Sequence, residues 1–98
     1  MEVRFADEDL QRLEVDPDFN AGFADEIVVA YRKRLQLIRA APDERDFYAL
    51  KSLHYEKLSG KRSHQKSMRL NKQWRLILEI VSDDQGRFVA VISIEDYH

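Results

Sequence analysis

SMRLNKQWRLILEI, residues 67–80, carries the clearest structural pattern in the chain. Apolar and polar residues alternate in two runs, 67–71 and 74–80. A period of two is typical of strands that bury one face. The pattern therefore predicts two antiparallel strands joined near Lys72. Trp74 is then expected to pack in the core, with Arg69 and Arg75 together on the opposite, open face.

The residues that follow this hairpin predict a third strand. Asp83-Asp84-Gln85-Gly86 has the composition of a tight turn, and residues 88–94 are rich in β-branched residues and apolar on both faces. Such a strand is expected at the centre of a sheet.

The first half of the chain predicts a short edge strand and two helices. Val3 and Phe5 alternate with polar residues, and Asp7 is placed to cap a short helix. A longer helix is readable from about residue 23 to 40, with Arg32, Lys33 and Arg39 on its polar side. Pro42 ends it. Residues 43–49 are compatible with a further helical turn, and residues 50–65 read as a basic loop.

Together these elements predict one α+β domain over residues 1–98. It consists of a short N-terminal strand, two helices and a three-stranded antiparallel sheet, with the helices packed on one face. The sequence contains no cysteine, which excludes disulfides and thiolate-bound metals. It also contains no apolar run near the roughly 20 residues that span a bilayer, so we expect a cytoplasmic protein without membrane contact.

Charge is strongly segregated along the chain. The net charge is −2, yet residues 51–75 contain eight lysines and arginines and one acid, a local charge of +7. A positive block of this kind favours a polyanion or an acidic partner. An ordinary solvated, lysine-rich face is the alternative.

The same segment contains residue types that could cleave RNA without a metal. Such cleavage needs a base for the 2′-hydroxyl, cations for the developing phosphorane charge and an acid for the leaving oxygen. Histidines 54, 64 and 98 suit the proton transfers, although for any one of them taken alone the pattern favours an ordinary surface residue. The guanidinium groups of Arg69 and Arg75 could bind a phosphate through bidentate hydrogen bonds. The histidines lack the spacing of a metal site, and we expect no metal or other cofactor.

Three motifs, in this order, resemble the RelE/ParE superfamily in its HigB branch. They are LHYEKLSGKR at residues 53–62, SMRLNKQWRL at 67–76 and IEDYH at 94–98. The resemblance implies a RelE-like, microbial RNase-type fold and a type II toxin that cuts mRNA on the ribosome and so inhibits translation. It implies a cognate antitoxin, usually a helix-turn-helix repressor of the HigA type, and DNA contact only through that antitoxin.

The resemblance also assigns residues. The expected catalytic residues are His54, Arg75, Asp96, Tyr97 and His98. Together with the charge pattern, it gives the expected RNA-binding residues Lys57, Lys61, Arg62, Lys66 and Arg69. Which histidine is the base and which the acid stays open.

Two other functions are compatible with the same sequence. A ParE-like protein would poison DNA gyrase through contacts alone, because a shared scaffold does not fix function. A catalytically inactive homologue would only bind its antitoxin. The terminal Tyr-His pair favours the nuclease, since ParE-like chains generally lack it.

Overall fold

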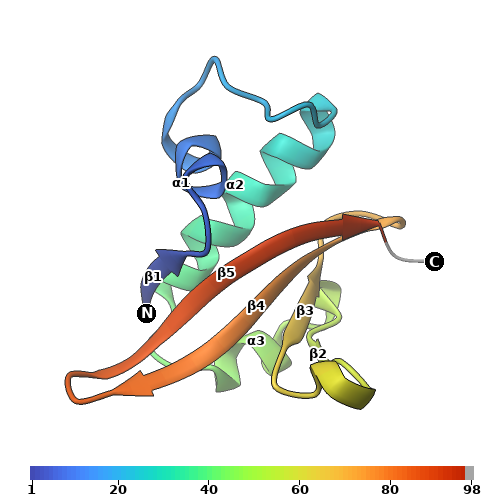
Figure 1. Ribbon diagram of the computed structural model, residues 1–98. Helices are drawn as coiled ribbons and strands as arrows, with labels where there is room; N and C mark the ends of the chain where they lie inside the picture. Colours follow the sequence, from blue (N-terminus) through green and yellow to red (C-terminus); the bar gives the residue numbers. More distant parts are fainter. Residues whose placement is uncertain (97–98) are drawn as a thin grey trace.

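The computed structural model describes residues 1–96 and contains one five-stranded sheet with helices beside it (Figure 1). The helices are α1 (Glu8–Val15), α2 (Asp25–Ala40) and α3 (Arg45–Ala49), with short 3-10 turns η1 (Lys51–Leu53) and η2 (Gly60–Arg62). The strands are β1 (Glu2–Phe5), β2 (Glu56–Lys57), β3 (Lys66–Arg69), β4 (Trp74–Asp83) and β5 (Gly86–Asp96). The predicted α+β class and the order of the main elements are confirmed.

The strand count is a correction to the predicted three-stranded sheet. The observed order is β1-β5-β4-β3-β2, in which β1 pairs with β5 in parallel and the other pairs are antiparallel. β2 is two charged residues long and has no apolar alternation, so the sequence carries no pattern for it. The parallel pairing of β1 joins residues more than 80 positions apart, which local periodicity cannot reveal.

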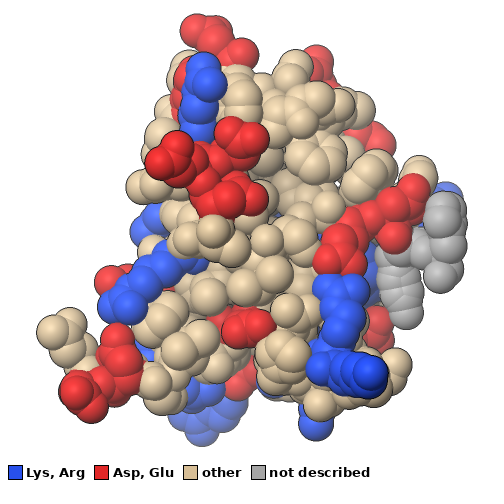
Figure 2. Space-filling model, viewed as in Figure 1, with Lys and Arg blue, Asp and Glu red and all other residues tan. Residues whose placement is uncertain are grey.

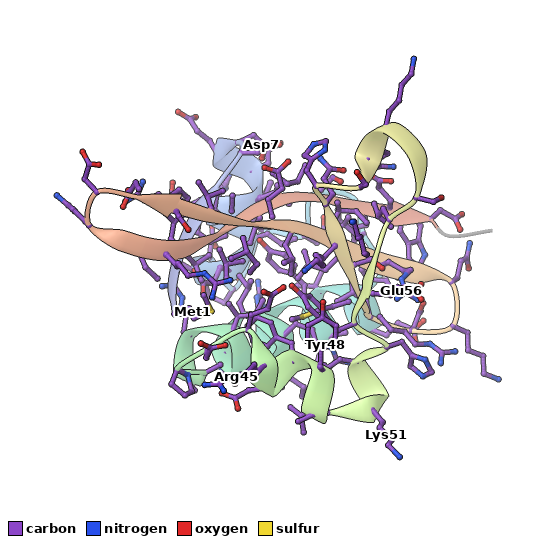
Figure 3. All side chains as sticks on the ribbon, turned by 90° about the horizontal axis from the view of Figure 1, so that it is seen from below. Met1, Asp7, Arg45, Tyr48, Lys51 and Glu56 are labelled. Carbon is purple, nitrogen blue, oxygen red and sulfur yellow. The ribbon has the colours of Figure 1, made fainter. Side chains whose placement is uncertain are left out.

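Helices α2 and α3 cover one face of the sheet, and α1 packs against α2 beside the β1 edge (Figure 1). Asp7 caps α1 as predicted, accepting a hydrogen bond from the Leu10 N–H at 2.8 Å. The core lies between these helices and the sheet, where side chains fill the space (Figure 3). Its fully buried members include Leu13, Tyr31, Leu35, Phe47, Met68, Leu76 and Val91.

A bulge in β5 changes which residues face the core. Leu78 pairs with Val91, but Ile77 pairs with Ser93, which leaves Ile92 as an extra residue. An extra residue reverses the alternation beyond it. Val89 and Val91 face the core before the bulge and Ile94 packs against it afterwards. Glu95 is therefore placed opposite Arg75 on the other face of the sheet.

No helix within residues 1–96 is both long and apolar enough to traverse a bilayer.

Candidate functional site

The two strand arginines of the predicted open face lie side by side. The β3–β4 register pairs Arg69 directly with Arg75, and directly opposed side chains leave a sheet on the same face. Their neighbours Met68 and Leu76 are opposed in the same way and are fully buried in the core. The predicted division of this hairpin into a core face and an arginine face is confirmed.

Arg75 is anchored within the protein. Its Nε donates to Ser67 Oγ at 2.9 Å, and its Nη2 donates to the carbonyl oxygen of His54 at 2.5 Å. Glu56 Oε1 lies 3.4 Å from Nη2, and 12% of the side chain is exposed. These contacts fix the plane of the guanidinium before any ligand arrives, which is the preorganisation that electrostatic catalysis requires.

His54 is held in an uncommon backbone conformation next to this arginine. It ends η1 with φ 45° and ψ 48°. This left-handed backbone geometry costs a non-glycine residue about 1–2 kcal/mol. Its ring Nε2 lies 3.1 Å from Arg69 Nη1. A guanidinium can only donate, so a hydrogen bond between the two side chains has Nε2 as its acceptor.

The loop that contains η2 folds over the same face. Arg62 donates to Glu95 with both terminal nitrogens, at 2.9 and 2.7 Å, and its Nε donates to Gln65 Oε1. Ser93 Oγ donates to Glu95 as well, at 2.6 Å. The hydrogen bonds from Arg62 are the main reason why the pKa of Glu95 lies below its usual value. On β4, Glu79 lies 3.3 Å from His64 and accepts from Gln65.

Not all of the predicted RNA-binding residues meet on this face. Lys66 points toward the helices, where it pairs with Glu44 at 2.5 Å and lies near the ring of Tyr48. Lys57 is opposite Lys66 in the β2–β3 register and leaves the sheet on the same side. Lys61 is exposed on η2. The structure therefore brings His54, Arg62, Arg69 and Arg75 together and places the two strand lysines elsewhere.

Asp96 ends β5 directly after Glu95, and alternation along the strand directs its side chain away from the face that carries Glu95 and Arg75. It is opposite Trp74 in the register, and its Oδ2 accepts a hydrogen bond from Gln73 at 2.9 Å. The predicted catalytic residues Tyr97 and His98 lie outside the described residues.

Carboxylates near the arginines were missed by the sequence reasoning. Glu56, Glu79 and Glu95 reach the same face from three strands and pair with its basic groups. Figure 2 shows the result at the lower right, where Lys and Arg side chains over η2 adjoin acidic ones near the end of β5. Alternation along β4 does predict an outward Glu79, whereas the side of Glu95 depends on the bulge. The face is a set of paired charges, not a uniformly basic surface.

No three histidine, aspartate or glutamate side chains among residues 1–96 are grouped so that they could hold a metal ion.

Comparison with known proteins identifies relatives of the whole chain. The sequence model of one family, described as the RelE-like toxin of the type II toxin-antitoxin system HigB, matches residues 3–97. A search of curated proteins found no match.

Solved structures share the fold at low sequence identity. A YoeB/ParE toxin from Agrobacterium tumefaciens superposes with a TM-score of 0.60 and 14% identity, covering 100% of both chains. The toxin-antitoxin complex RelBE2 from Mycobacterium tuberculosis gives 0.51 and 17%, covering 98% of this chain and 96% of that one. A conserved hypothetical protein from Helicobacter pylori gives 0.53 and 16%, covering 99% and 94%.

Proposed function

Because this chain belongs to the HigB-like family of RelE-like type II toxins, we propose that it is an mRNA endoribonuclease that acts on the ribosome in the cytoplasm. The observation that carries the proposal is the cluster of His54, Arg69 and Arg75. The imidazole Nε2 of His54 lies 3.1 Å from the Arg69 guanidinium, and the Arg75 guanidinium, paired with Arg69 on the same face of the sheet, binds the backbone carbonyl of His54.

In the proposed reaction, the substrate phosphate draws the Arg69 guanidinium away from His54, and the freed Nε2 takes the proton from the 2′-hydroxyl of the RNA. The 2′-oxygen then attacks phosphorus, and the bond from phosphorus to the 5′-oxygen breaks. Arg75 and Arg69 stabilise the negative charge that develops on the phosphoryl oxygens. The resemblance alone assigns the proton for the leaving 5′-oxygen to His98 and substrate positioning to Tyr97 and Asp96. The products are a 2′,3′-cyclic phosphate and a 5′-hydroxyl end, and no metal takes part.

The fixed position of Arg75 supports this assignment. Its two hydrogen bonds to Ser67 and His54 tie it to the backbone turn that carries the proposed base. A phosphate held by Arg75 would thus be positioned relative to His54. Arg62 and the exposed Lys61 on η2 are proposed to bind the RNA backbone on either side of this point.

A pair of histidine variants tests the proposal. His54→Ala removes the proposed base, and His64→Ala removes an exposed histidine that contacts Glu79 instead of the arginines. We expect His54→Ala to lower mRNA cleavage by a factor of about 10²–10⁴, the usual contribution of a general base. His64→Ala should cut and arrest growth like the unmodified chain. Primer extension on mRNA after induced expression is the measurement, with His98→Ala assayed alongside.

The outcomes separate the competing functions. Full cleavage by His54→Ala would remove this residue from the mechanism. Growth arrest without mRNA cuts, together with inhibited supercoiling by purified gyrase, would identify a gyrase poison. Stable binding of an antitoxin without arrest or cleavage would identify an inactive homologue.

We also propose a cognate antitoxin as the protein partner. One structural neighbour was solved as a toxin-antitoxin complex. A helix-turn-helix repressor of the HigA type is the expected partner for a HigB-like chain.

A further inference from the structure

The outer edge of β5 is covered over only part of its length. β1 pairs with residues 88–91, and the chain leaves the sheet for α1 after Ala6 N donates to the Val91 carbonyl at 2.9 Å. Within residues 1–96, the strand that pairs in register with residues 93–95 is β4, and β1 does not reach them. Successive residues of a strand direct their backbone N–H and C=O groups to opposite neighbours, so some of these groups face away from β4. Among the described residues, a short sheet edge beside α1 thus carries no partner strand.

A cavity of about 260 Å³ borders this open edge. Its walls come from α1, the connection between α1 and α2, and β5, and are mostly apolar, with Leu10, Leu13, Phe23, Ile92 and Ile94. Phe23 is held by an edge-to-face contact with Trp74, with ring centres 5.6 Å apart. The volume is below the roughly 300–1,000 Å³ that is typical of small-molecule sites, and it suits a single large side chain.

The rim of the cavity is acidic. Asp7 and Asp9 line it, and Glu8 follows in the same turn of α1. Figure 2 shows acidic side chains gathered over α1, above an uncharged surface that extends toward β5. In Figure 3 the labelled Asp7 lies on the opposite side of the sheet from Tyr48 of α3. Carboxylates at this rim repel RNA and attract lysine or arginine, so the chemistry of the cavity fits a basic polypeptide and not the substrate.

We propose that this edge and cavity bind an extended segment of the cognate antitoxin. The segment adds a strand to β5 beyond the end of β1, places one large apolar side chain in the cavity and directs a lysine or arginine toward Asp9. Strand addition takes its affinity from main-chain hydrogen bonds and its specificity from such side-chain pockets. The identity of the occupant rests on the proposed toxin function, whereas the open edge and the cavity do not.

Two charge reversals on the same helical turn test the site. Asp9→Lys changes a residue that lines the cavity, and Glu8→Lys makes the same change at a neighbour that does not line it. Both remove an acid from the first turn of α1, so they weaken the helix alike. The probe is the protein encoded by the reading frame adjacent to the gene. We expect Asp9→Lys to weaken its binding by about tenfold or more, equivalent to 1.4 kcal/mol, and Glu8→Lys to leave it within about twofold.

Backbone hydrogen exchange tests strand addition independently. In the complex, amide exchange in residues 93–95 should slow by about tenfold or more, because a new strand would protect the outward N–H groups. Exchange in α3, on the far side of the sheet, should stay unchanged. Thermal melting of each variant alone identifies any that fail to fold, and for those the unmodified chain still gives the exchange result.

The possible failures are distinguishable. Equal binding by both variants, or protection of another surface without residues 93–95, overturns this inference and leaves the nuclease function untouched. If the unmodified chain does not bind the adjacent protein at all, both the docking site and the proposed partner are overturned, while mRNA cleavage remains a separate measurement. A dimer of this chain that Ile92→Lys abolishes would assign the cavity to a second copy and overturn the antitoxin proposal.

Discussion

Glu95 lies between two arginines of the proposed RNA-binding face. Arg62 binds its carboxylate from the loop with two hydrogen bonds, and Arg75 is its partner across the β4–β5 ladder. A carboxylate bound in this way occupies the fork of donors that an RNA phosphate would use. RNA must therefore compete with Glu95 for Arg62.

Glu95→Gln should bind RNA several-fold more tightly than the unmodified chain. The substitution removes a negative charge from the site and releases Arg62 for a phosphate. One additional phosphate contact to a single strand should steepen the slope of log K against log salt by about 0.7. Binding is measured with 2′-O-methyl RNA, which lacks the attacking hydroxyl. Glu2→Gln on β1 is the charge-matched control and should change neither quantity. Weaker binding by Glu95→Gln would show instead that Glu95 positions Arg62 for the substrate.

Between elements, the link from α2 to the end of α1 is made by Arg32. Its guanidinium donates to the carbonyl oxygens of Leu13 at 2.9 Å and Asp16 at 2.8 Å. Carbonyl groups at the end of a helix have no partners within the helix, so Arg32 satisfies them from the neighbouring helix. It also meets the negative end of the α1 dipole.

Arg32→Ala should lower the free energy of unfolding by about 2 kcal/mol, the usual range for hydrogen bonds from a charged group to half-buried acceptors. The neighbouring Lys33 is exposed, and Lys33→Ala should change stability by less than about 0.5 kcal/mol. Urea unfolding of both variants is the measurement. Equal stability of the two variants would mean that water replaces Arg32 at no cost.

Arg32 also illustrates the limit of sequence periodicity. The helical spacing correctly predicted the α2 helix and its buried face, because apolar side chains repeat at i, i+3 and i+4. The same spacing placed Arg32 and Arg39 on the polar side, and could not show that one caps α1 and the other pairs with Glu14. These contacts depend on where α1 packs, which local patterns do not encode.

In the candidate site, too, local patterns predicted some features, and contacts that depend on packing were not predictable. The period of two in residues 67–76 correctly placed Arg69 and Arg75 on one face, because register in a hairpin is a local property. The contact between His54 and Arg69 depends on a left-handed turn, and the position of Glu95 depends on the β5 bulge. Neither has a composition signal, since His54 is not a glycine and Ile92 resembles its neighbours.

Over the whole molecule, one carboxylate joins three separate parts of the chain. Glu44, at the start of α3, accepts hydrogen bonds from Tyr55 at 2.8 Å, Lys66 at 2.5 Å and Arg87 at 3.1 Å. Burial alone would raise the pKa of Glu44, but the hydrogen bonds from Lys66 and Tyr55 outweigh it and lower the pKa. The Glu44 carboxylate thus links α3 to β3 and β5, and does so in its ionised form.

The chain should therefore lose stability in acid through Glu44. A carboxyl whose pKa is lower in the folded state contributes its stability above its unfolded pKa, about 4.3, and loses it as pH falls through the folded value. Melting temperature should be nearly constant from pH 7 to about 5 and fall at lower pH.

Glu44→Gln should lower the free energy of unfolding at pH 7 by about 2 kcal/mol, because the half-buried Lys66 loses its carboxylate partner. Below pH 4 the difference between the variant and the unmodified chain should shrink, because the protonated Glu44 is itself neutral. Thermal unfolding of both proteins across pH 3–7 measures the loss of stability in acid and the difference between variant and unmodified chain. Glu8→Gln on α1 is the exposed control. A difference that stays constant down to pH 3 would assign the effect of Glu44→Gln to packing. The charge of Glu44 would then contribute nothing to the link between α3 and the strands β3 and β5.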